Sequence, residues 1–232
     1  MKRSARKLLL FDIDGTLVKT DGAAGKIMVQ SIEVEVGRPI QATRDVYLGS
    51  TDRLIVKTLL ERNCIAVEDL EGATDRILQR YAIAVFPALS PVGTVTPLPG
   101  VVELLERCSQ REDLALGLVT GNIQAGARAK LIPPGLDQHF HVGAFGDDAL
   151  ERNALPPIAV WRAQAFFEET FAPQDTWIIG DTPKDIDCAK ANGLRCLAVA
   201  SGWIGPEALC AHRPDALLND LSDATAVLRL FD

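Results

Sequence analysis

The fold is decided by the stretch Leu8-Leu9-Leu10-Phe11-Asp12-Ile13-Asp14-Gly15-Thr16-Leu17. Four apolar residues lead directly into two aspartates, and a glycine follows. A short apolar run that ends at a turn signal is typical of a strand buried on both faces of a parallel sheet. Asp12 and Asp14 should then lie at the carboxyl end of that strand, where open α/β sheets bind ligands. Because alternate side chains of an extended segment point the same way, both carboxylates can face one pocket.

Two carboxylates this close repel each other unless a cation lies between them or one of them keeps its proton. Both conditions suit phosphoryl transfer, which needs a metal near the phosphate, an ionised carboxylate and a protonatable one. The alternative is that Asp12 and Asp14 are ordinary turn acids, with Asp14-Gly15 in a tight turn. Polar stretches after later strands favour the first interpretation.

After residue 98, apolar runs alternate with amphipathic segments. We expect further strands at Leu114–Val119, Val142–Phe145, Thr176–Gly180 and Arg195–Val199. We expect helices between them at Val101–Ser109, Ile123–Lys130, Asn153–Glu169 and Lys184–Asn192. This alternation predicts an α/β fold with a doubly wound, parallel, Rossmann-like core sheet of five strands.

Residues 19–97 differ in character from the rest of the chain. Apolar residues recur there at helical spacing, which predicts helices near Gly22–Val36, Thr51–Asn63 and Val67–Ala84. Proline and glycine at Pro91–Thr94 and Pro97–Gly100 then break the pattern, as a returning linker would. We therefore expect a helical insertion at 19–97 and a core made of residues 1–18 and 98–232.

Two more polar stretches follow expected strands. In Thr120-Gly121-Asn122, a hydroxyl and the backbone N–H groups of a helix start suit phosphate binding, although an ordinary N-cap with a turn glycine is the alternative. In Gly180–Asp187, Asp181 and Asp185 suit Mg²⁺, which takes one or two protein carboxylates and keeps several waters. We expect Asp181 to bind the metal directly and Asp185 to orient a water or Lys184, or simply to cap the helix. Asp187 is expected to be a surface acid.

Together with Asp-Ile-Asp-Gly-Thr at 12–16, these stretches resemble the motifs of the haloacid dehalogenase-like phosphohydrolases. The resemblance implies that Asp12 is the nucleophile that forms an aspartyl-phosphate and that Asp14 is the general acid and then the base. It also implies that Mg²⁺ is held by the Asp12 carboxylate, the Asp14 backbone carbonyl and Asp181. The insertion resembles the helical cap of the phosphoglycolate phosphatase-like branch. Asp14 separates the pattern from the dehalogenases of the superfamily, which lack an acid there.

The third motif departs from the family pattern. A lysine is expected between the third strand and Asp181, but residues 144–176 contain none. Arg152, just before an expected helix, is the first candidate for this cation, because a guanidinium can bind a phosphate oxygen and a carboxylate together. Lys130 is the alternative, and Arg162 is expected on a solvated helix face.

Within the cap, Tyr47-Leu48-Gly49-Ser50-Thr51-Asp52-Arg53 resembles a substrate-facing loop of phosphoglycolate phosphatase-like proteins. The resemblance implies that Thr51 and Arg53 contact the substrate, with Arg53 meeting a second anionic group. The alternative is an ordinary helix start with a surface arginine. With Gly121 and Asn122 on the core side, these residues form the expected substrate site.

The composition of the chain argues against two classes of binding partner. The 232-residue chain carries a net charge of −7, which argues against nucleic acid or an anionic membrane as the main partner. No stretch approaches a membrane span, and the apolar run after the basic first seven residues is too short for a signal peptide, so we expect a cytoplasmic protein.

The cysteines and histidines suggest no additional site. The five cysteines are odd in number and without a CxxC pair, so we interpret all of them as small buried or half-buried hydrophobic residues. His139 and His141 would share one side of a strand, where a polar strand edge is favoured over a metal site.

The sequence thus predicts a Mg²⁺-dependent phosphatase that acts on a small phosphorylated metabolite. Two alternatives remain: a phosphomutase or phosphotransferase that passes the same phosphoryl group to a phosphosugar, and a non-catalytic phosphate-binding module. Because the cap decides which leaving group fits, the sequence does not name the substrate.

Overall fold

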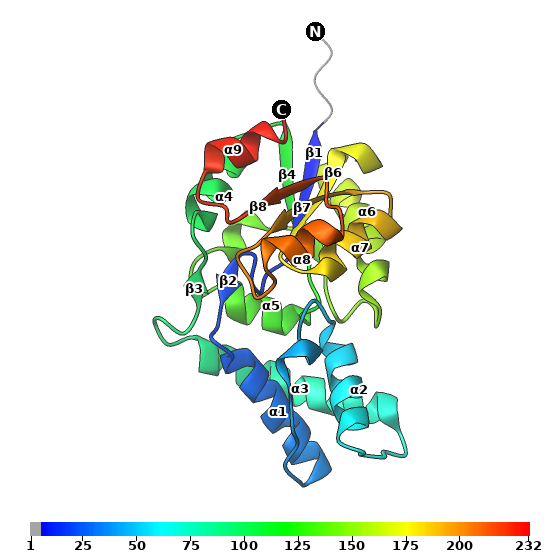
Figure 1. Ribbon diagram of the computed structural model, residues 1–232. Helices are drawn as coiled ribbons and strands as arrows, with labels where there is room; N and C mark the ends of the chain where they lie inside the picture. The colour runs from blue at the N-terminus through cyan, green and yellow to red at the C-terminus, as the bar shows by residue number, and fades with distance from the viewer. Residues whose placement is uncertain (1–5) are drawn as a thin grey trace.

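The computed structural model describes residues 6–232, so the first five residues of the basic N-terminal segment lie outside the described residues. Its centre is a parallel sheet with the strand order β5-β4-β1-β6-β7-β8 (Figure 1). The strands are β1 (Lys7–Phe11), β4 (Leu114–Val119), β5 (Gly143–Ala144), β6 (Thr176–Gly180), β7 (Arg195–Val199) and β8 (Ala216–Leu218). β1 lies inside the sheet, between β4 and β6. Later strands are added first on one side of β1 and then on the other.

The predicted fold class is confirmed, but the strand count is wrong: within residues 6–232 the sheet has six strands instead of five. The missed strand, β8, is three half-buried residues at the sheet edge, paired only with β7. Its apolar run of three residues is shorter and less buried than those of the inner strands. The other edge strand, β5, is only two residues long, shorter than the expected Val142–Phe145.

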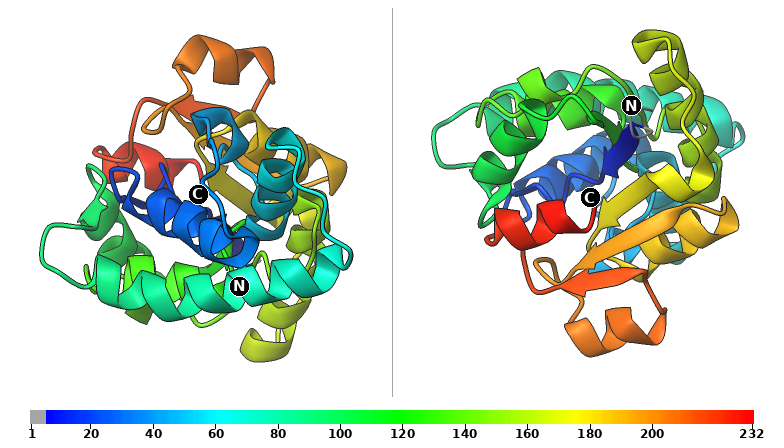
Figure 2. Two further views of the ribbon diagram at one scale, coloured as in Figure 1. Left: turned by 90° about the horizontal axis from the view of Figure 1, so that it is seen from below. Right: turned by 90° about the horizontal axis from the view of Figure 1, so that it is seen from above.

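Helices cover both faces of this sheet (Figure 2). Leu9 and Phe11 of β1 belong to one apolar core and Leu8 and Leu10 to the other, because alternate side chains of a strand point to opposite faces. The helices after the cap are α4 (Val101–Ser109), α5 (Gln124–Leu131), α6 (Leu155–Phe167), α7 (Pro183–Ala191), α8 (Pro206–Ala211) and α9 (Ala224–Arg229). Short 3₁₀ turns lie at Arg44–Val46, Asp137–His139, Arg152–Ala154 and Pro173–Asp175.

Three helices form a separate layer at the carboxyl end of the sheet (Figure 1). They are α1 (Ala23–Val36), α2 (Asp52–Arg62) and α3 (Leu70–Leu89). The chain leaves the core through β2 (Val18–Lys19) and returns through β3 (Thr96–Pro97), and these two strands pair as an antiparallel ribbon. We refer to this helical layer between β2 and β3 as the cap.

Two expectations about side chains are wrong. Cys64 and Cys210 are exposed, whereas the remaining cysteines are buried. His139 and His141 do not share a strand, because β5 begins only at residue 143. His139 Nδ1 lies 2.8 Å from a serine hydroxyl at the end of α4, and the His141 ring stacks on an aromatic ring of α6.

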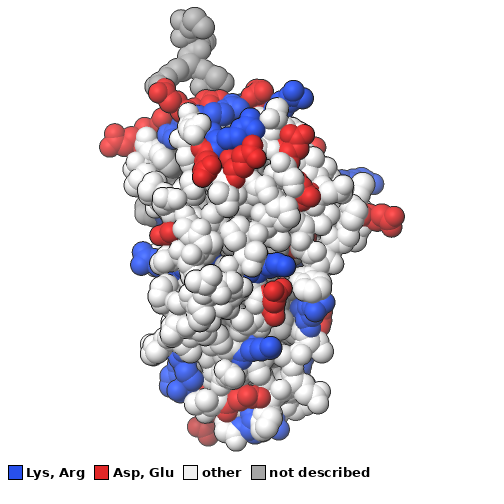
Figure 3. All heavy atoms as spheres, turned by 90° about the vertical axis from the view of Figure 1, so that its left-hand side faces the viewer, with Lys and Arg blue, Asp and Glu red and all other residues white. Residues whose placement is uncertain are grey.

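The surface carries both signs of charge. On the face shown in Figure 3, Lys and Arg side chains are interspersed with Asp and Glu. Among the described residues, no helix combines the length and the apolar character that crossing a membrane requires.

The fold predicts the effect of a methyl group at Gly100, which begins α4 with a φ of 78°. A Cβ there would overlap the backbone carbonyl of Leu221. Gly100→Ala should lower the free energy of unfolding by about 1–2 kcal/mol for the left-handed backbone, and the overlap should add about 1–3 kcal/mol. Urea denaturation at equilibrium measures the sum.

Gly37→Ala is the matched control. Gly37 also has a positive φ, 69°, but a Cβ there would meet no atom within 4 Å. Gly37→Ala should therefore lower the free energy of unfolding only by the backbone contribution. Equal losses in the two variants would show that the loop at Leu221 yields to the methyl group.

Candidate active site

The candidate site forms where neighbouring strands end. Asp12, Thr120 and Asp181 are the first residues after β1, β4 and β6, respectively. Because these strands are parallel neighbours, their carboxyl ends meet at one edge of the sheet. All three side chains are buried, with at most 4% of each residue exposed. The order of the strands thus assembles three of the predicted residues.

A tight turn follows Asp12. The backbone N–H groups of Leu17 and Val18 both donate to the Ile13 carbonyl, at 2.9 and 3.0 Å. Gly15 has a φ of 79°, and a Cβ there would overlap the Asp181 carboxylate. Position 15 therefore requires glycine for two reasons: the positive φ of the backbone and the close approach of Asp181.

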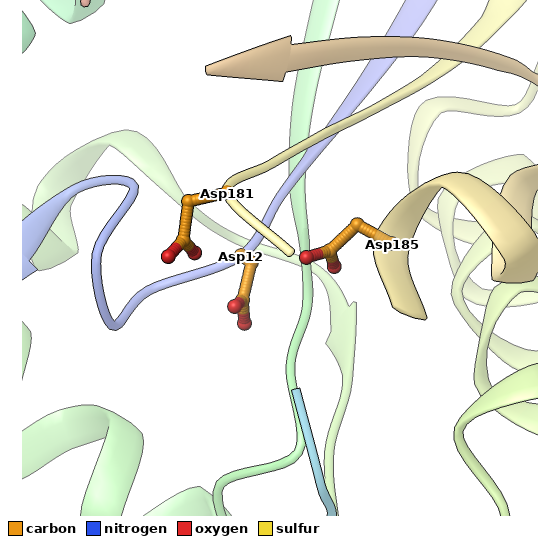
Figure 4. A group of neighbouring side chains, drawn as sticks. All are labelled: Asp12, Asp181 and Asp185. Atoms are coloured by element: carbon orange, nitrogen blue, oxygen red, sulfur yellow. The ribbon is translucent and has the colours of Figure 1, made fainter. Parts of the chain in front are cut away.

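Three buried carboxylates converge beside this turn (Figure 4). Asp12, Asp181 and Asp185 each place one oxygen within 4.8 Å of the others. Asp185 lies in the first turn of α7, where its Oδ2 accepts hydrogen bonds from the Thr182 backbone, at 3.0 Å, and hydroxyl, at 2.6 Å. Asp185 therefore does cap its helix, and it also belongs to the carboxylate cluster.

The three carboxylates of the cluster outnumber the one guanidinium that pairs with them, that of Arg152. Burial raises the pKa of Asp12 to about 6, although Arg152 opposes the shift, and the charges of Asp185 and Asp14 add to it. Burial, together with the charges of Asp185 and Asp12, raises the pKa of Asp181 well above its ordinary value. Hard oxygen ligands with unrelieved mutual repulsion are the donor set that a divalent cation such as Mg²⁺ fits.

Arg152 is the cation next to Asp12. Its Nη2 pairs with Asp185 and lies 3.3 Å from Asp12 Oδ1. Burial alone would lower the pKa of Arg152, but the two carboxylates raise it above its ordinary value, so the guanidinium stays charged. The expected contact between Asp185 and Lys184 is not formed, because Lys184 donates to the Ser50 hydroxyl at 2.6 Å instead.

Lys130 occupies a different position from Arg152. This buried residue of α5 donates from Nζ to Asp14 Oδ2 at 2.6 Å and to the Asn122 side-chain carbonyl. Asn122 Nδ2 donates to the same Asp14 oxygen and to Thr120 Oγ1, both at 2.8 Å. The two candidate cations are thus divided: Arg152 contacts Asp12, and Lys130 contacts Asp14.

The cap contacts the core through the loop at 47–53. The sequence marked this loop but did not show which of its residues reaches the core. Asp52, the first residue of α2, is buried, and its Oδ2 accepts from the Ile123 N–H at 2.8 Å. Its backbone N–H donates to the Gly121 carbonyl at 2.7 Å. A Cβ at Gly121 would overlap the Ser50 carbonyl. Gly121 therefore permits the cap to sit directly on the core.

The two predicted substrate contacts of the cap lie elsewhere. Thr51 caps α2 by accepting from the Leu54 N–H, and its hydroxyl donates to the Leu150 carbonyl at 2.6 Å. Arg53 pairs with Asp75 at 2.5 Å on α3, beside a separate hollow. Because these contacts already engage both side chains, we leave Thr51 and Arg53 out of the proposed substrate site. Of the other predicted side chains, Asp187 is exposed and Arg162 pairs with the carboxylate of Asp148.

A cavity of about 1090 Å³ lies between cap and core. Its floor includes Asp12, Asp14, Thr120, Arg152 and Asp181, and the cap contributes Tyr47, Asp52, Ile55 and Tyr81. At its mouth, the guanidinium of Arg44 stacks on the Trp203 ring, 3.5 Å from the ring centre. Sequence reasoning placed Tyr47 and Asp52 in a substrate-facing loop but missed Arg44, Ile55 and Tyr81. The short polar run at 50–53 marked the loop but not which of its side chains faces the core.

Comparisons with known proteins agree with this geometry. Residues 9–199 match the family model described as haloacid dehalogenase-like hydrolase. The chain is 28% identical over 225 residues to phosphoglycolate phosphatase 1 of Pseudomonas aeruginosa, covering 94% of this chain and 78% of that protein. It is 28% identical over 231 residues to pyrophosphatase PpaX of Bacillus pumilus, covering 98% and 99%.

A solved structure shows the same fold. The crystal structure of a predicted phosphoglycolate phosphatase from Haemophilus somnus aligns with a TM-score of 0.74 at 19% identity, covering 97% of this chain and 99% of that one. The family model spans most of the chain and includes Asp12, Asp14, Thr120, Arg152 and Asp181. The resemblance inferred from the motifs is thereby confirmed, and the chain belongs to the haloacid dehalogenase-like hydrolases.

Proposed function

We propose that this protein is a Mg²⁺-dependent phosphatase that hydrolyses a small phosphorylated metabolite through an aspartyl-phosphate on Asp12. The observation that supports this most directly is the buried Asp12 carboxylate, held 3.3 Å from the Arg152 guanidinium on the floor of a cavity. Asp14 faces the same cavity. A module that only binds phosphate would gain nothing from carboxylates beside its anion, whereas a phosphoryl-transfer site needs them.

Asp12 supplies the nucleophile. Arg152 favours its ionised form against the effect of burial. One Asp12 oxygen attacks phosphorus, the bond from phosphorus to the leaving oxygen breaks, and the leaving oxygen takes the bonding electron pair. The phosphoryl group then resides on Asp12. A covalent intermediate of this kind divides one difficult displacement into two easier steps.

Asp14 handles the protons of both steps. As an acid it donates a proton to the leaving oxygen. As the resulting carboxylate it accepts a proton from the water that attacks the aspartyl-phosphate, which releases phosphate and restores both aspartates. Asp14 is suited to this exchange because its side chain is 46% exposed, whereas that of Asp12 is 6% exposed.

Donors around Asp12 can hold the phosphoryl oxygens. Thr120 Oγ1 accepts its bond from Asn122, so the hydroxyl proton of Thr120 is available to a phosphoryl oxygen. Arg152 lines the same cavity and can offer guanidinium N–H groups to these oxygens. Preorganised donors aimed at the transferring group stabilise the charge that develops on it.

Asp12, Asp181 and Asp185, with the Asp14 backbone carbonyl, would hold Mg²⁺. When bound, the ion supplies positive charge that offsets the charge of the phosphoryl group. Asp181 is kept in place by a 3.2 Å hydrogen bond from the Thr16 hydroxyl and by contact with the backbone at Gly15, which leaves no room for a Cβ. These contacts orient a ligand oxygen before any ion arrives.

The names of the relatives support hydrolysis of a small substrate that carries a second anionic group, as phosphoglycolate and pyrophosphate both do. They favour transfer to water over transfer to a phosphosugar. The cap residues Tyr47, Ile55 and Tyr81 would lie over the leaving group.

Release of inorganic phosphate from a panel of phosphate esters with Mg²⁺ tests the function, with 2-phosphoglycolate and pyrophosphate included. Asp12→Asn should abolish release from every ester, because the amide cannot attack phosphorus yet fills the same volume. Asp14→Asn should lower the rate by about 10²–10⁴-fold, the usual contribution of general acid–base catalysis. Circular dichroism checks that both variants are folded. An Asp12 variant as active as the parent would refute the mechanism.

Metal removal should abolish activity. EDTA should stop phosphate release and Mg²⁺ should restore it, whereas Ca²⁺ should restore little, because Ca²⁺ prefers more ligands at longer distances in looser geometry. Binding has its own readout: saturating Mg²⁺, at ~100 times its Kd, should stabilise the parent against unfolding by about 2.7 kcal/mol.

Asp181→Asn is the control for the metal site. It should lose most of this stabilisation because one of the cluster's charged oxygens becomes an amide. Full activity in chelator, or an unchanged stabilisation in Asp181→Asn, would remove the metal from the proposed site.

Arg152 should be essential for rate. Arg152→Ala leaves Asp12 and Asp185 without their buried partner, which typically costs about 3–5 kcal/mol, or roughly 10²–10³-fold in kcat if that cost falls on the transition state. Arg152→Lys should recover part of the loss but not all of it. An ammonium restores the positive charge but lacks the bidentate geometry of a guanidinium. Arg162→Ala, which breaks an ion pair with Asp148 outside the cavity, is the matched control. Similar kcat values in the two alanine variants would contradict the assignment.

A further inference from the structure

Both hydrogen bonds to the Asp14 side chain reach one oxygen. Lys130 Nζ and Asn122 Nδ2 donate to Oδ2, at 2.6 and 2.8 Å. Within residues 6–232, no hydrogen bond to Oδ1 is formed. Oδ1 is therefore the oxygen left to exchange a proton with a molecule in the cavity.

Lys130 is unusual among the lysines because it is only 4% exposed. A buried ammonium is costly unless charged or polar partners compensate it. Its hydrogen bonds go to Asp14 and Asn122, and it forms none with Asp12, Asp181 or Asp185. Its charge is thus directed at the second aspartate of the first motif rather than at the carboxylate cluster.

The third neighbour of Lys130 comes from the cap. Asp52 is 6% exposed; burial raises its pKa to about 7, and the charge of Lys130 opposes this shift. Asp52 is fixed by its bonds to the backbone at Ile123 and Gly121, which flank Asn122. Lys130 therefore lies in the field of a core carboxylate and of a cap carboxylate, and the second is present only while α2 rests on the core.

We propose that Lys130 is a positioning residue: it fixes the plane of the Asp14 carboxyl group through Oδ2, so that Oδ1 meets the leaving oxygen, and Asp52 of the closed cap holds Lys130 in place. This inference rests on the proposed function. When Asp14 gives its proton from Oδ1 to the leaving oxygen, the carboxylate that forms is stabilised by the Lys130 ammonium and the Asn122 amide. Proton donation is thereby linked to the cap.

This role predicts a dependence on the leaving group. An alkyl phosphate needs a proton on its leaving oxygen, whereas an aryl phosphate with an acidic phenol leaves without one. Loss of a residue that orients Asp14 should therefore reduce kcat/KM for the alkyl ester far more than for the aryl ester. A residue that only stabilises the fold would reduce both equally.

The experiment compares kcat/KM for glycerol phosphate and 2,4-dinitrophenyl phosphate in the full-length protein with Mg²⁺. In Lys130→Met, the ratio of alkyl to aryl kcat/KM should fall by ~10–100-fold, part of the ~10²–10⁴-fold that general acid catalysis contributes. Lys130→Arg should recover part of the ratio. Asp52→Asn should lower it less but in the same direction. Arg128→Met removes an exposed charge from the same helix and should leave the ratio unchanged.

A double-mutant cycle shows whether Lys130 acts through Asp14. Asp14→Asn should itself lower the ratio, and adding Lys130→Met should lower it little further, because coupled residues are not additive. Additive losses, or equal losses on both esters, would overturn the inference. If Lys130→Met does not fold, Lys130→Arg and Asp52→Asn provide the same measurement.

Failure of the inference can be told apart from failure of the proposed function. If Asp12→Asn hydrolyses both esters as fast as the parent, the phosphatase mechanism is wrong, and the role of Lys130 is overturned with it. If Asp12→Asn is inactive but the alkyl-to-aryl ratio does not change in the Lys130 and Asp52 variants, only the inference is overturned.

Discussion

The mutual repulsion of Asp12, Asp181 and Asp185 is the constraint on which the rest of this structure depends. Each carboxylate loses hydration on burial and faces the others within 4.8 Å. Such a cluster is tolerable only where positive charge and hydrogen-bond donors surround it. The fold supplies Arg152 at one side and the Thr16 and Thr182 hydroxyls at others. What remains uncompensated is negative charge, which the proposed Mg²⁺ would neutralise.

Much of the fold could be predicted because the inner strands are buried on both faces. The expected Leu114–Val119, Thr176–Gly180 and Arg195–Val199 coincide with β4, β6 and β7, which are buried apart from the half-buried Arg195. β8 is also apolar, but its three half-buried residues are too few to mark a strand. Strand ends also located Asp12, Thr120 and Asp181, because a parallel sheet brings the residues that follow its inner strands to one edge.

The partners of those residues could not be predicted, because they depend on how helices pack. Arg53 was expected to face the substrate, but successive helical residues point about 100° apart. Asp52 faces the core, so its neighbour Arg53 turns toward Asp75 on α3. In the same way, the sequence offered Lys130 and Arg152 as competitors for one role. Only the packing of α5 shows that Lys130 contacts Asp14 whereas Arg152 contacts Asp12.

The contact between cap and core has a consequence for how relatives of this protein can diverge. At Gly49, a Cβ would lie 2.6 Å from the Thr182 hydroxyl, so this position is closed to larger residues, as is Gly121. Tyr47, Ile55 and Tyr81, in contrast, line the cavity between cap and core. Under the proposed function, substitutions at Tyr47, Ile55 and Tyr81 would change the preferred substrate, while Gly49 and Gly121 at the contact between cap and core stay constant. One catalytic floor can in this way serve lineages with different metabolic tasks.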